Sequence, residues 1–348
     1  MTRQRIVALL VLVACLLWIL GSNGFGVGAA AALLPVLTTA GVYAVGGVGL
    51  NLQYGHGGLL NFGFVAFMTV GAYVMVLLLP HRSGPGATVA EGVVPLPVAL
   101  VLATLAAAFL GLLCGIPAIR LRSDYLAIVM IAVAEILRIL ARDIPSVTGG
   151  VHGVLNYSDS LQDLRPEFVD GLADALNVQA FQLWLCVVAW ASLVAVTLLV
   201  KGLMQTPWGL MLKAVRDDEL AVRSLGKSPT VLKLQALALG GAIGGLAGGL
   251  LAFQLSQVNP DVFIPQITFF IFAIVTLGGT GSTWGPALGA VVFWTLLTES
   301  GALVSQVLGS GTAASATRYV IVGVLLVLLI NFRPQGLLGR RRDVVLEF

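Results

Sequence analysis

Residues 231 to 254 read VLKLQALALGGAIGGLAGGLLAFQ, a stretch in which Lys233 is the single charged residue. At a rise of about 1.5 Å per residue, a helix of this length crosses the roughly 30 Å hydrocarbon core of a bilayer. The stretch therefore predicts a membrane-spanning α-helix. Small residues let neighbouring helix backbones approach closely, so its glycine-rich side is predicted to pack within the chain, with a dimer seam as the alternative. The glycines fall at four-residue steps in two adjacent rows: Gly240, Gly244 and Gly248, and Gly241, Gly245 and Gly249.

The composition extends this prediction to the whole chain. Of its 348 residues, 58% are hydrophobic and 10% are charged, and the mean hydropathy is +0.99. A soluble domain carries about 25% charged residues, so we expect an all-α polytopic membrane protein in which residues 1–348 form one transmembrane domain. About ten apolar stretches are long enough to span the bilayer: 6–22, 29–50, 59–79, 93–117, 125–141, 181–200, 231–254, 266–280, 284–300 and 317–332. The first is interpreted as a retained signal anchor, because apolar spans continue to the C-terminal end.

The distribution of charge predicts how these spans are oriented. If both termini are cytoplasmic, most of the 19 Lys and Arg residues fall on the cytoplasmic side, as the positive-inside rule requires. Residues 142–180 then form an external segment, and that segment is acidic. Its acidic residues are Asp143, Asp159, Asp163, Glu167, Asp170 and Asp174. The net charge of +3 gives no reason to expect a nucleic-acid partner.

A charged segment interrupts the apolar pattern just before the opening stretch. Residues 206–233 read TPWGLMLKAVRDDELAVRSLGKSPTVLK, and they predict one amphipathic helix of about five turns from Trp208 to Leu225. Thr206 suits the N-cap, Pro207 the first helical position, and Gly226 the left-handed stop. We interpret residues 202–230 as a cytoplasmic loop whose helix binds a partner's groove or a membrane surface.

The end of this segment imitates a phosphate-binding loop. Residues 225–228 read LGKS, but the first glycine of that motif would fall at Ala221, inside the predicted helix, and no strand precedes it. If ATP powers the protein, another subunit must therefore bind it.

Two further segments are broken by glycine, 55–63 (GHGGLLNFG) and 278–289 (GGTGSTWGPALG). Interrupted apolar segments in the two halves of a transporter point to helix breaks beside the substrate route, whereas tight turns between antiparallel spans are the alternative. The candidate pathway residues are Asn51, Asn61, Tyr73 and Glu135. The neutral groups also serve as ordinary interhelical hydrogen-bonding groups, and Glu135 can form a structural ion pair with Arg138 three residues later.

Catalytic and metal sites are not indicated. His56, His81 and His152 are expected in loops, apart from one another and from carboxylate clusters. An integral membrane enzyme needs convergent acid, base or nucleophilic groups at one depth, and none is apparent. We therefore expect no enzymatic activity, no cofactor and no metal in this chain.

Five separated motifs resemble the permease subunits of bacterial branched-chain amino acid ABC importers, more narrowly the LivM type of the wider LivH/LivM family. They are LRSDYLAI at 121–128, TGG at 148–150, AVRDDELAVRSLGKSP at 214–229, LGGTGS at 277–282 and RPQGL at 333–337. The resemblance runs in order from about residue 40 to 338. One departure is VHG at 151–153, where relatives more often carry Pro, Asn or Asp in the middle. Related urea and short-chain amide permeases share most of these motifs.

The resemblance implies an importer permease fold of the larger ten-helix type in the bacterial inner membrane. It implies a heterodimer with a LivH-type subunit, two ATP-binding cassette subunits and a soluble solute-binding protein, surrounded by membrane lipid. The loop between the sixth and seventh spans would dock on the ATPase, and ATP-driven closure would move its helix to give alternating access. The acidic external segment would dock the solute-binding protein.

The residues expected to couple this permease to the ATPase all lie in the charged segment. Polar contacts with the ATPase would come from Arg216, Asp217, Asp218, Glu219 and Arg223. A groove of the ATPase would be filled by Met211, Val215 and Val222. The full set is Trp208, Met211, Val215, Arg216, Asp217, Asp218, Glu219, Val222, Arg223 and Gly226. A self-contained secondary transporter or channel and a non-conducting membrane scaffold are the alternative functions; the former should carry more buried charge than Glu135 and Arg138 provide.

Overall fold

The computed structural model of the chain describes residues 27–80, 82–83, 92–118, 123–155, 157–255, 257–308 and 335–339, with a few residues of 316–331. Helices lie within each predicted span from 29–50 through 284–300, but the predicted span 59–79 is too long at its start, because its helix, α3, begins only at Val65; the predicted span 6–22 and half of 317–332 lie outside the described residues. The elements are α2 (Val27–Asn51), η1 (Leu52–His56), α3 (Val65–Leu78), β1 (Arg82–Ser83), α4 (Leu96–Ala118), α5 (Ser123–Asp143), α6 (Pro145–Thr148), η2 (Gly150–His152), β2 (Val154–Leu155), α7 (Asp159–Gln162), α8 (Glu167–Leu176), α9 (Ala180–Gln205), α10 (Pro207–Asp217), α11 (Glu219–Ser224), α12 (Pro229–Leu255), β3 (Gln257–Val258), η3 (Pro260–Val262), α13 (Gln266–Gly278) and α14 (Gly285–Leu308).

Within the described residues, four helices are long and apolar enough to cross a membrane. They are Ala31–His56, which runs through α2 and η1, Leu96–Pro117 in α4, Ala180–Gln205 in α9 and Pro229–Leu255 in α12. The helices α3 and α13 are apolar but shorter. The chain is therefore a largely helical, polytopic membrane protein.

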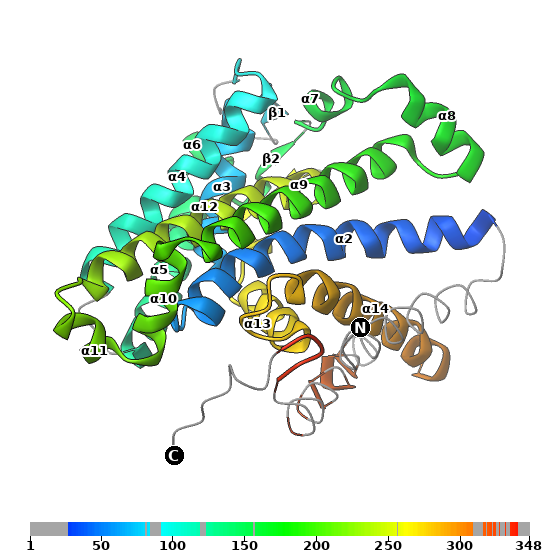
Figure 1. Ribbon diagram of the computed structural model, residues 1–348. Coiled ribbons are helices and arrows are strands. Elements are labelled where there is room, and N and C mark those ends of the chain that lie inside the picture. The colour runs from blue at the N-terminus through cyan, green and yellow to red at the C-terminus, as the bar shows by residue number, and fades with distance from the viewer. Residues whose placement is uncertain are drawn as a thin grey trace.

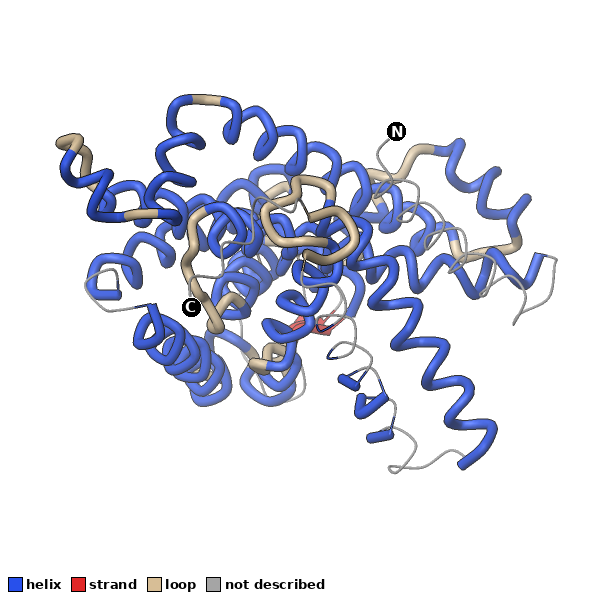
Figure 2. Tube along the Cα trace, turned by 60° about the horizontal axis from the view of Figure 1, so that its bottom comes forward, coloured by secondary structure: helices blue, strands red, loops and turns tan. Residues whose placement is uncertain are grey.

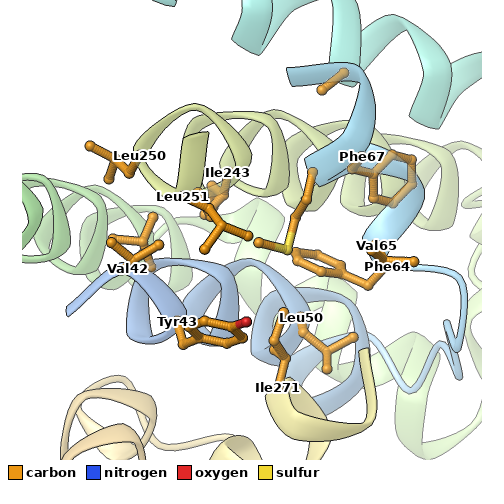
Figure 3. Close-up of a cluster of buried hydrophobic side chains, with 14 of the residues drawn as sticks. Val42, Tyr43, Leu50, Phe64, Val65, Phe67, Ile243, Leu250, Leu251 and Ile271 are labelled. Atoms are coloured by element: carbon orange, nitrogen blue, oxygen red, sulfur yellow. The ribbon is translucent and has the colours of Figure 1, made fainter. Parts of the chain in front are cut away.

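Two of the long helices, α2 and α12, lie at the centre of the bundle. Figure 1 shows them running side by side with α9, while α3 and α4 flank α12 and the pair α13 and α14 lies below α2. The buried core forms where α2, α3, α12 and α13 meet, and Figure 3 shows Leu50, Phe67, Leu251 and Ile271 pointing into it. By contrast, α4 and α9 expose many aliphatic side chains, among them Leu105 and Leu198. Such side chains suit contact with lipid tails, which are as apolar as leucine itself.

The glycine-rich side of α12 packs against α3 and α4 of the same chain. A Cβ atom added at Gly248 would lie 2.0 Å from the carbonyl oxygen of Met68, and one at Gly245 would lie 2.5 Å from the Cβ of Ala107. Gly71 of α3 in turn approaches the backbone of Gly245. Real Cβ atoms do not tolerate such distances, so these glycines set the separation of the helices. The seam is thus filled within the chain, as in the first of the two interpretations.

The expectation of an all-α fold is wrong in one detail, because three short strands form an antiparallel sheet in the order β1-β2-β3. Arg82 pairs with Leu155, and Leu155 with Gln257, so the sheet joins three loops that are distant in sequence. Figure 2 shows the strands gathered at one place in an otherwise helical chain. Pairing satisfies backbone groups that the helices leave unbonded at their ends. Two-residue strands have no sequence period that could predict them.

The single amphipathic helix predicted from Trp208 to Leu225 is also wrong, since the chain forms two helices that break at Asp218. Asp218 has an extended backbone (φ −154°, ψ 106°), and its carboxylate accepts hydrogen bonds from the N–H groups of Leu220 and Ala221. It is thus the N-cap of α11. Thr206 does occupy the N-cap position of α10, but its hydroxyl donates to the carbonyl of Leu203 and caps nothing.

We expect Asp218→Ala to loosen α11 by about 1 kcal/mol, the usual value of an N-cap. Hydrogen exchange of the backbone amides in α11 should then accelerate by about fivefold, a factor that corresponds to that free energy. Asp217→Ala is the matched control, because Asp217 precedes the cap and accepts no N–H from α11 among the described contacts. Equal exchange in the two variants would contradict the capping role.

Candidate functional site

The helices α10 and α11 lie together at one end of the bundle, far from the sheet and from α8 (Figure 1). The helix α10 packs against α9, α12 and η1, and it buries Leu212 and Val215 toward the rest of the chain. Trp208 reaches α12, where its indole N–H donates to Oε1 of Gln235 at 2.7 Å. The apolar face of α10 therefore packs largely against other helices of the same chain.

Arg216, in the last turn of α10, faces the interior of the protein. Its Nη1 donates to the carbonyl oxygen of Gly55 at 2.6 Å, and its Nε donates to Oδ1 of Asp217 at 3.0 Å. Its side chain is 22% exposed. The carbon stem passes close to Gly58, where an added Cβ would lie 2.8 Å from Cγ of Arg216. Gly58 also has a φ of +67°, a conformation that glycine adopts without strain.

The two glycine-broken segments meet beside this arginine. Asn51 donates from Nδ2 to the carbonyl of Ser282 and accepts the N–H of Gly281 on Oδ1, both at 2.9 Å. The two segments approach closely, because a Cβ at Gly55 would lie 2.6 Å from the backbone nitrogen of Gly281. The segment 55–63 begins within a single π-helical turn, η1, and such turns are frequent at functional sites.

A stretch near the C-terminus joins the same end. The N–H groups of Leu337 and Leu338 donate to the carbonyls of Leu277 and Gly278 at 2.9 Å each. They thereby satisfy carbonyl groups that the end of α13 leaves free. The motif at 333–337 thus contacts the motif at 277–282 directly, and the motif at 214–229 is linked to 277–282 through the end of α2.

A buried amide network supports the segment after η1. Gln53 donates from Nε2 to the carbonyl of Leu237 at 3.1 Å, and its Oε1 accepts Nδ2 of Asn61 at 2.9 Å. Oδ1 of Asn61 then accepts the N–H of Gly63. Because the amide groups of Asn51 and Asn61 are engaged in the protein, both residues hold segments together in this conformation.

The helix α11 is held to α12 by charge. Glu219 accepts Nζ of Lys233 at 2.5 Å and Nη2 of Arg223 at 2.7 Å. The hydrogen bond from Lys233 is the main reason that the pKa of Glu219 lies below its ordinary value, although partial burial opposes the shift. A lowered carboxyl pKa means that the ion pair is complete above about pH 4.3 and is lost only as the pH falls through the lowered value. We therefore expect this contact to be constant across neutral pH.

The outward surface of α10 and α11 differs from the predicted one. Val215 and Val222 are buried against the chain itself, so the expectation that they fill an ATPase groove is wrong for this conformation, and Met211 is half-buried. The prediction failed because the apolar stripe of an amphipathic helix packs equally well on its own protein. The exposed residues of this surface include Leu210, Asp217, Asp218, Leu220, Arg223, Leu225 and Gly226.

Tyr73 and Glu135 lie toward the opposite end of the bundle, apart from Asn51 and Asn61. Glu135 forms an ion pair with Arg138 at 2.6 Å, and Arg138 also reaches Asp261 of η3 at 2.9 Å. The predicted structural pair is therefore present, with an acidic partner that sequence spacing could not reveal. The Tyr73 hydroxyl is buried without a hydrogen-bond partner, and its ring lies 6.1 Å from that of Phe263.

His56 corrects another expectation, since it does not lie in a loop. It closes η1 with 3% of its surface exposed, and its Nε2 has no hydrogen-bond partner. The position follows from the π-helical turn, which extends α2 beyond Asn51 and which the glycines of this segment concealed. In the described part of the chain, no group of three His, Cys, Asp or Glu residues could hold a metal ion.

Comparison with known proteins identifies the family. A family described as "Branched-chain amino acid transport system / permease component" matches residues 32–330. The LivM permease proteins of Salmonella typhimurium and Escherichia coli, named for high-affinity branched-chain amino acid transport, are 35% and 33% identical, over 89% of this chain and 70% of each relative. The LivH permease protein of Escherichia coli is 22% identical, over 87% of this chain and 93% of the relative. No solved structure matches significantly. The chain therefore belongs to the family of permease components of branched-chain amino acid transport systems.

Proposed function

We propose that this chain is one permease subunit of an ATP-driven importer for branched-chain amino acids. It has ten membrane helices in a bacterial inner membrane, with both termini in the cytoplasm. One observation carries the proposal beyond family membership: the amphipathic loop 202–230 lies at the end of the bundle where the glycine-broken segments meet. A partner that moves this loop acts directly on the segments that interrupt the spans.

The proposed importer function implies three kinds of partner. A LivH-type subunit supplies the second half of the pathway, two ATP-binding cassette subunits supply the energy, and a soluble solute-binding protein delivers the solute. Similarity to both LivM and LivH relatives supports a system with two related permeases. A permease for urea or short-chain amides is the alternative within the family.

The ATPase contact consists of the outward surface of α10 and α11. Leu220 and Leu225 are 73% and 80% exposed, and the nearby charged residues Asp217, Asp218 and Arg223 are exposed as well. An apolar centre with a charged rim is the usual anatomy of a protein interface. Trp208, Val215, Glu219 and Val222 contribute from beneath, by holding the two helices on the permease.

The external partner binds at the opposite end. Segment 142–180 contains α6, α7 and α8, and the exposed residues of its last helix include Glu167 and Asp174. An acidic surface steers a partner with a complementary basic patch. The solute pathway passes Tyr73 and Glu135, which retain an unpartnered hydroxyl and a partly exposed carboxylate. Asn51 and Asn61 shape the pathway walls through the bonds described above.

Copurification of the assembled complex tests this proposal. We expect Leu220→Asp with Leu225→Asp to reduce recovery of the ATPase subunits by about tenfold, because each charge would be buried in an apolar contact. Leu172→Asp is the control, since Leu172 is a 49% exposed leucine on α8 at the other end. If the unaltered chain recovers no ATPase, or if deleting 208–225 leaves solute uptake intact, the importer proposal fails.

A further inference from the structure

The contact between Arg216 and Gly55 joins the amphipathic loop to the end of α2. Four of the five carbonyls of the π-helical turn have described partners. Those of Leu52, Gln53 and Tyr54 accept the backbone N–H groups of the residues that follow the turn: Gly57, Leu59 and Gly58, respectively. The carbonyl of Gly55 instead accepts the guanidinium of Arg216. The side chain of another helix therefore completes the hydrogen bonding of this turn.

The π-helical turn η1 is itself held to the second glycine-broken segment, 278–289. Asn51 lies one turn before Gly55 and holds both Gly281 and Ser282. An added Cβ at Gly281 would lie 3.8 Å from Nη1 of Arg216. A shift of the Arg216 side chain would therefore move the end of α2. It would also move the loop between α13 and α14, because Asn51 bonds that loop directly to α2.

Arg216 is suited to this contact by chemistry and by space. Its planar guanidinium donates at once to Gly55 and Asp217, which fixes its orientation. Two glycines keep the contact open, because a Cβ at Gly55 or at Gly58 would collide with Asn51 or with the arginine stem. The exposed part of α10 and α11 remains free for a partner.

We infer that Arg216 is a positioning residue that transmits movement of the amphipathic loop to the two glycine-broken segments, and does not itself bind the ATPase. This inference rests on the proposed function. An effector changes a conformational equilibrium only through contacts that differ between the two states. The hydrogen bond between Arg216 and Gly55 is that contact. When α10 moves, this bond would form or break, and the conformation of the pathway would change with it.

The test uses the complete complex in lipid nanodiscs and in proteoliposomes, with Arg216→Gln compared to Lys201→Gln. Lys201 is the matched control because it is an exposed cationic residue near the end of α9, outside both α10 and α11. For Arg216→Gln we expect normal recovery of ATPase subunits and basal ATP hydrolysis within about twofold, but about tenfold fewer solute molecules imported per ATP, in the usual range of coupling effects. For Lys201→Gln the number imported per ATP should stay unchanged.

A conservative variant distinguishes transmission from folding. Arg216→Lys keeps one donor and a positive charge without the fixed fork, so we expect it to restore part of the import per ATP. Hydrogen exchange across residues 52–58 should rise in Arg216→Gln and fall back in Arg216→Lys. Loss of ATPase recovery in Arg216→Gln, or an unchanged import per ATP, would overturn the inference while leaving the importer proposal in place. Absence of ATPase from the unaltered complex would instead refute both.

Discussion

Gly248→Ala should strongly destabilise the permease, although alanine is the better helix former by about 1 kcal/mol. The added Cβ would lie 2.0 Å from the carbonyl oxygen of Met68 and 2.6 Å from its Cα. These are backbone atoms, so no side-chain rotation relieves the overlap, and α12 must move away from α3. We expect a loss of about 3 kcal/mol or more, at the upper end of overpacking effects, seen as a lower melting temperature in detergent.

The same substitution at Gly202 provides the control. Gly202 lies in α9, and nothing lies within 4 Å of a Cβ added there. Gly202→Ala should therefore gain about 0.5 to 1 kcal/mol from helix propensity. Opposite signs for two identical substitutions would establish that close helix approach requires Gly248. A neutral or stabilising Gly248→Ala would mean that α3 and α12 are farther apart in the membrane.

Asn51→Leu should be the second severe change. It removes both hydrogen bonds that hold the loop 281–282 against the end of α2. The N–H of Gly281 and the carbonyl of Ser282 would then face a leucine, and each buried unsatisfied group costs about 1 to 3 kcal/mol. We expect loss of solute uptake together with a lower melting temperature, measured on the purified complex.

Two variants make this prediction specific. Asn51→Asp retains the acceptor for Gly281 but loses the donor to Ser282, so its effect should lie between those of the native residue and leucine. Gln162→Leu replaces an exposed amide at the other end of the bundle and should change neither quantity. If Asn51→Leu lost uptake with unchanged stability, Asn51 would be a solute contact, as the sequence alone allowed.

The spans could be predicted from sequence because hydrocarbon imposes a local rule. A backbone in lipid must satisfy its own hydrogen bonds, so a long apolar run has one available structure, the helix. Helix ends near Pro207, Gly226 and Pro229 were also foreseen, since they follow from the chemistry of each residue. Asp218 was the exception. The sequence held a signal there, an aspartate three residues before a helix-forming alanine, but neighbouring charges concealed the cap.

The candidate site was predicted in part. The sequence located the amphipathic loop and the two glycine-broken segments, but not their meeting. It placed Arg216 on a partner, whereas the structure directs it to Gly55. It grouped Asn51 with Glu135, whereas these lie toward opposite ends of the bundle. An arginine at the edge of an amphipathic helix can face its own protein or a partner. Its direction depends on residues that are distant in sequence, and the helical pattern does not reveal them.

The sequence by itself determined that this chain is a helical membrane protein of the branched-chain permease family, and where most of its helices run. Those properties follow from the hydrophobicity of continuous segments and from short motifs, both of which can be recognised without knowing the tertiary contacts. Only the tertiary structure decided that Gly248 faces α3, that three short strands join distant loops, and that Asn51 and Arg216 connect the broken segments. Each of these contacts joins residues far apart in the chain, and its geometry arises only when the helices pack.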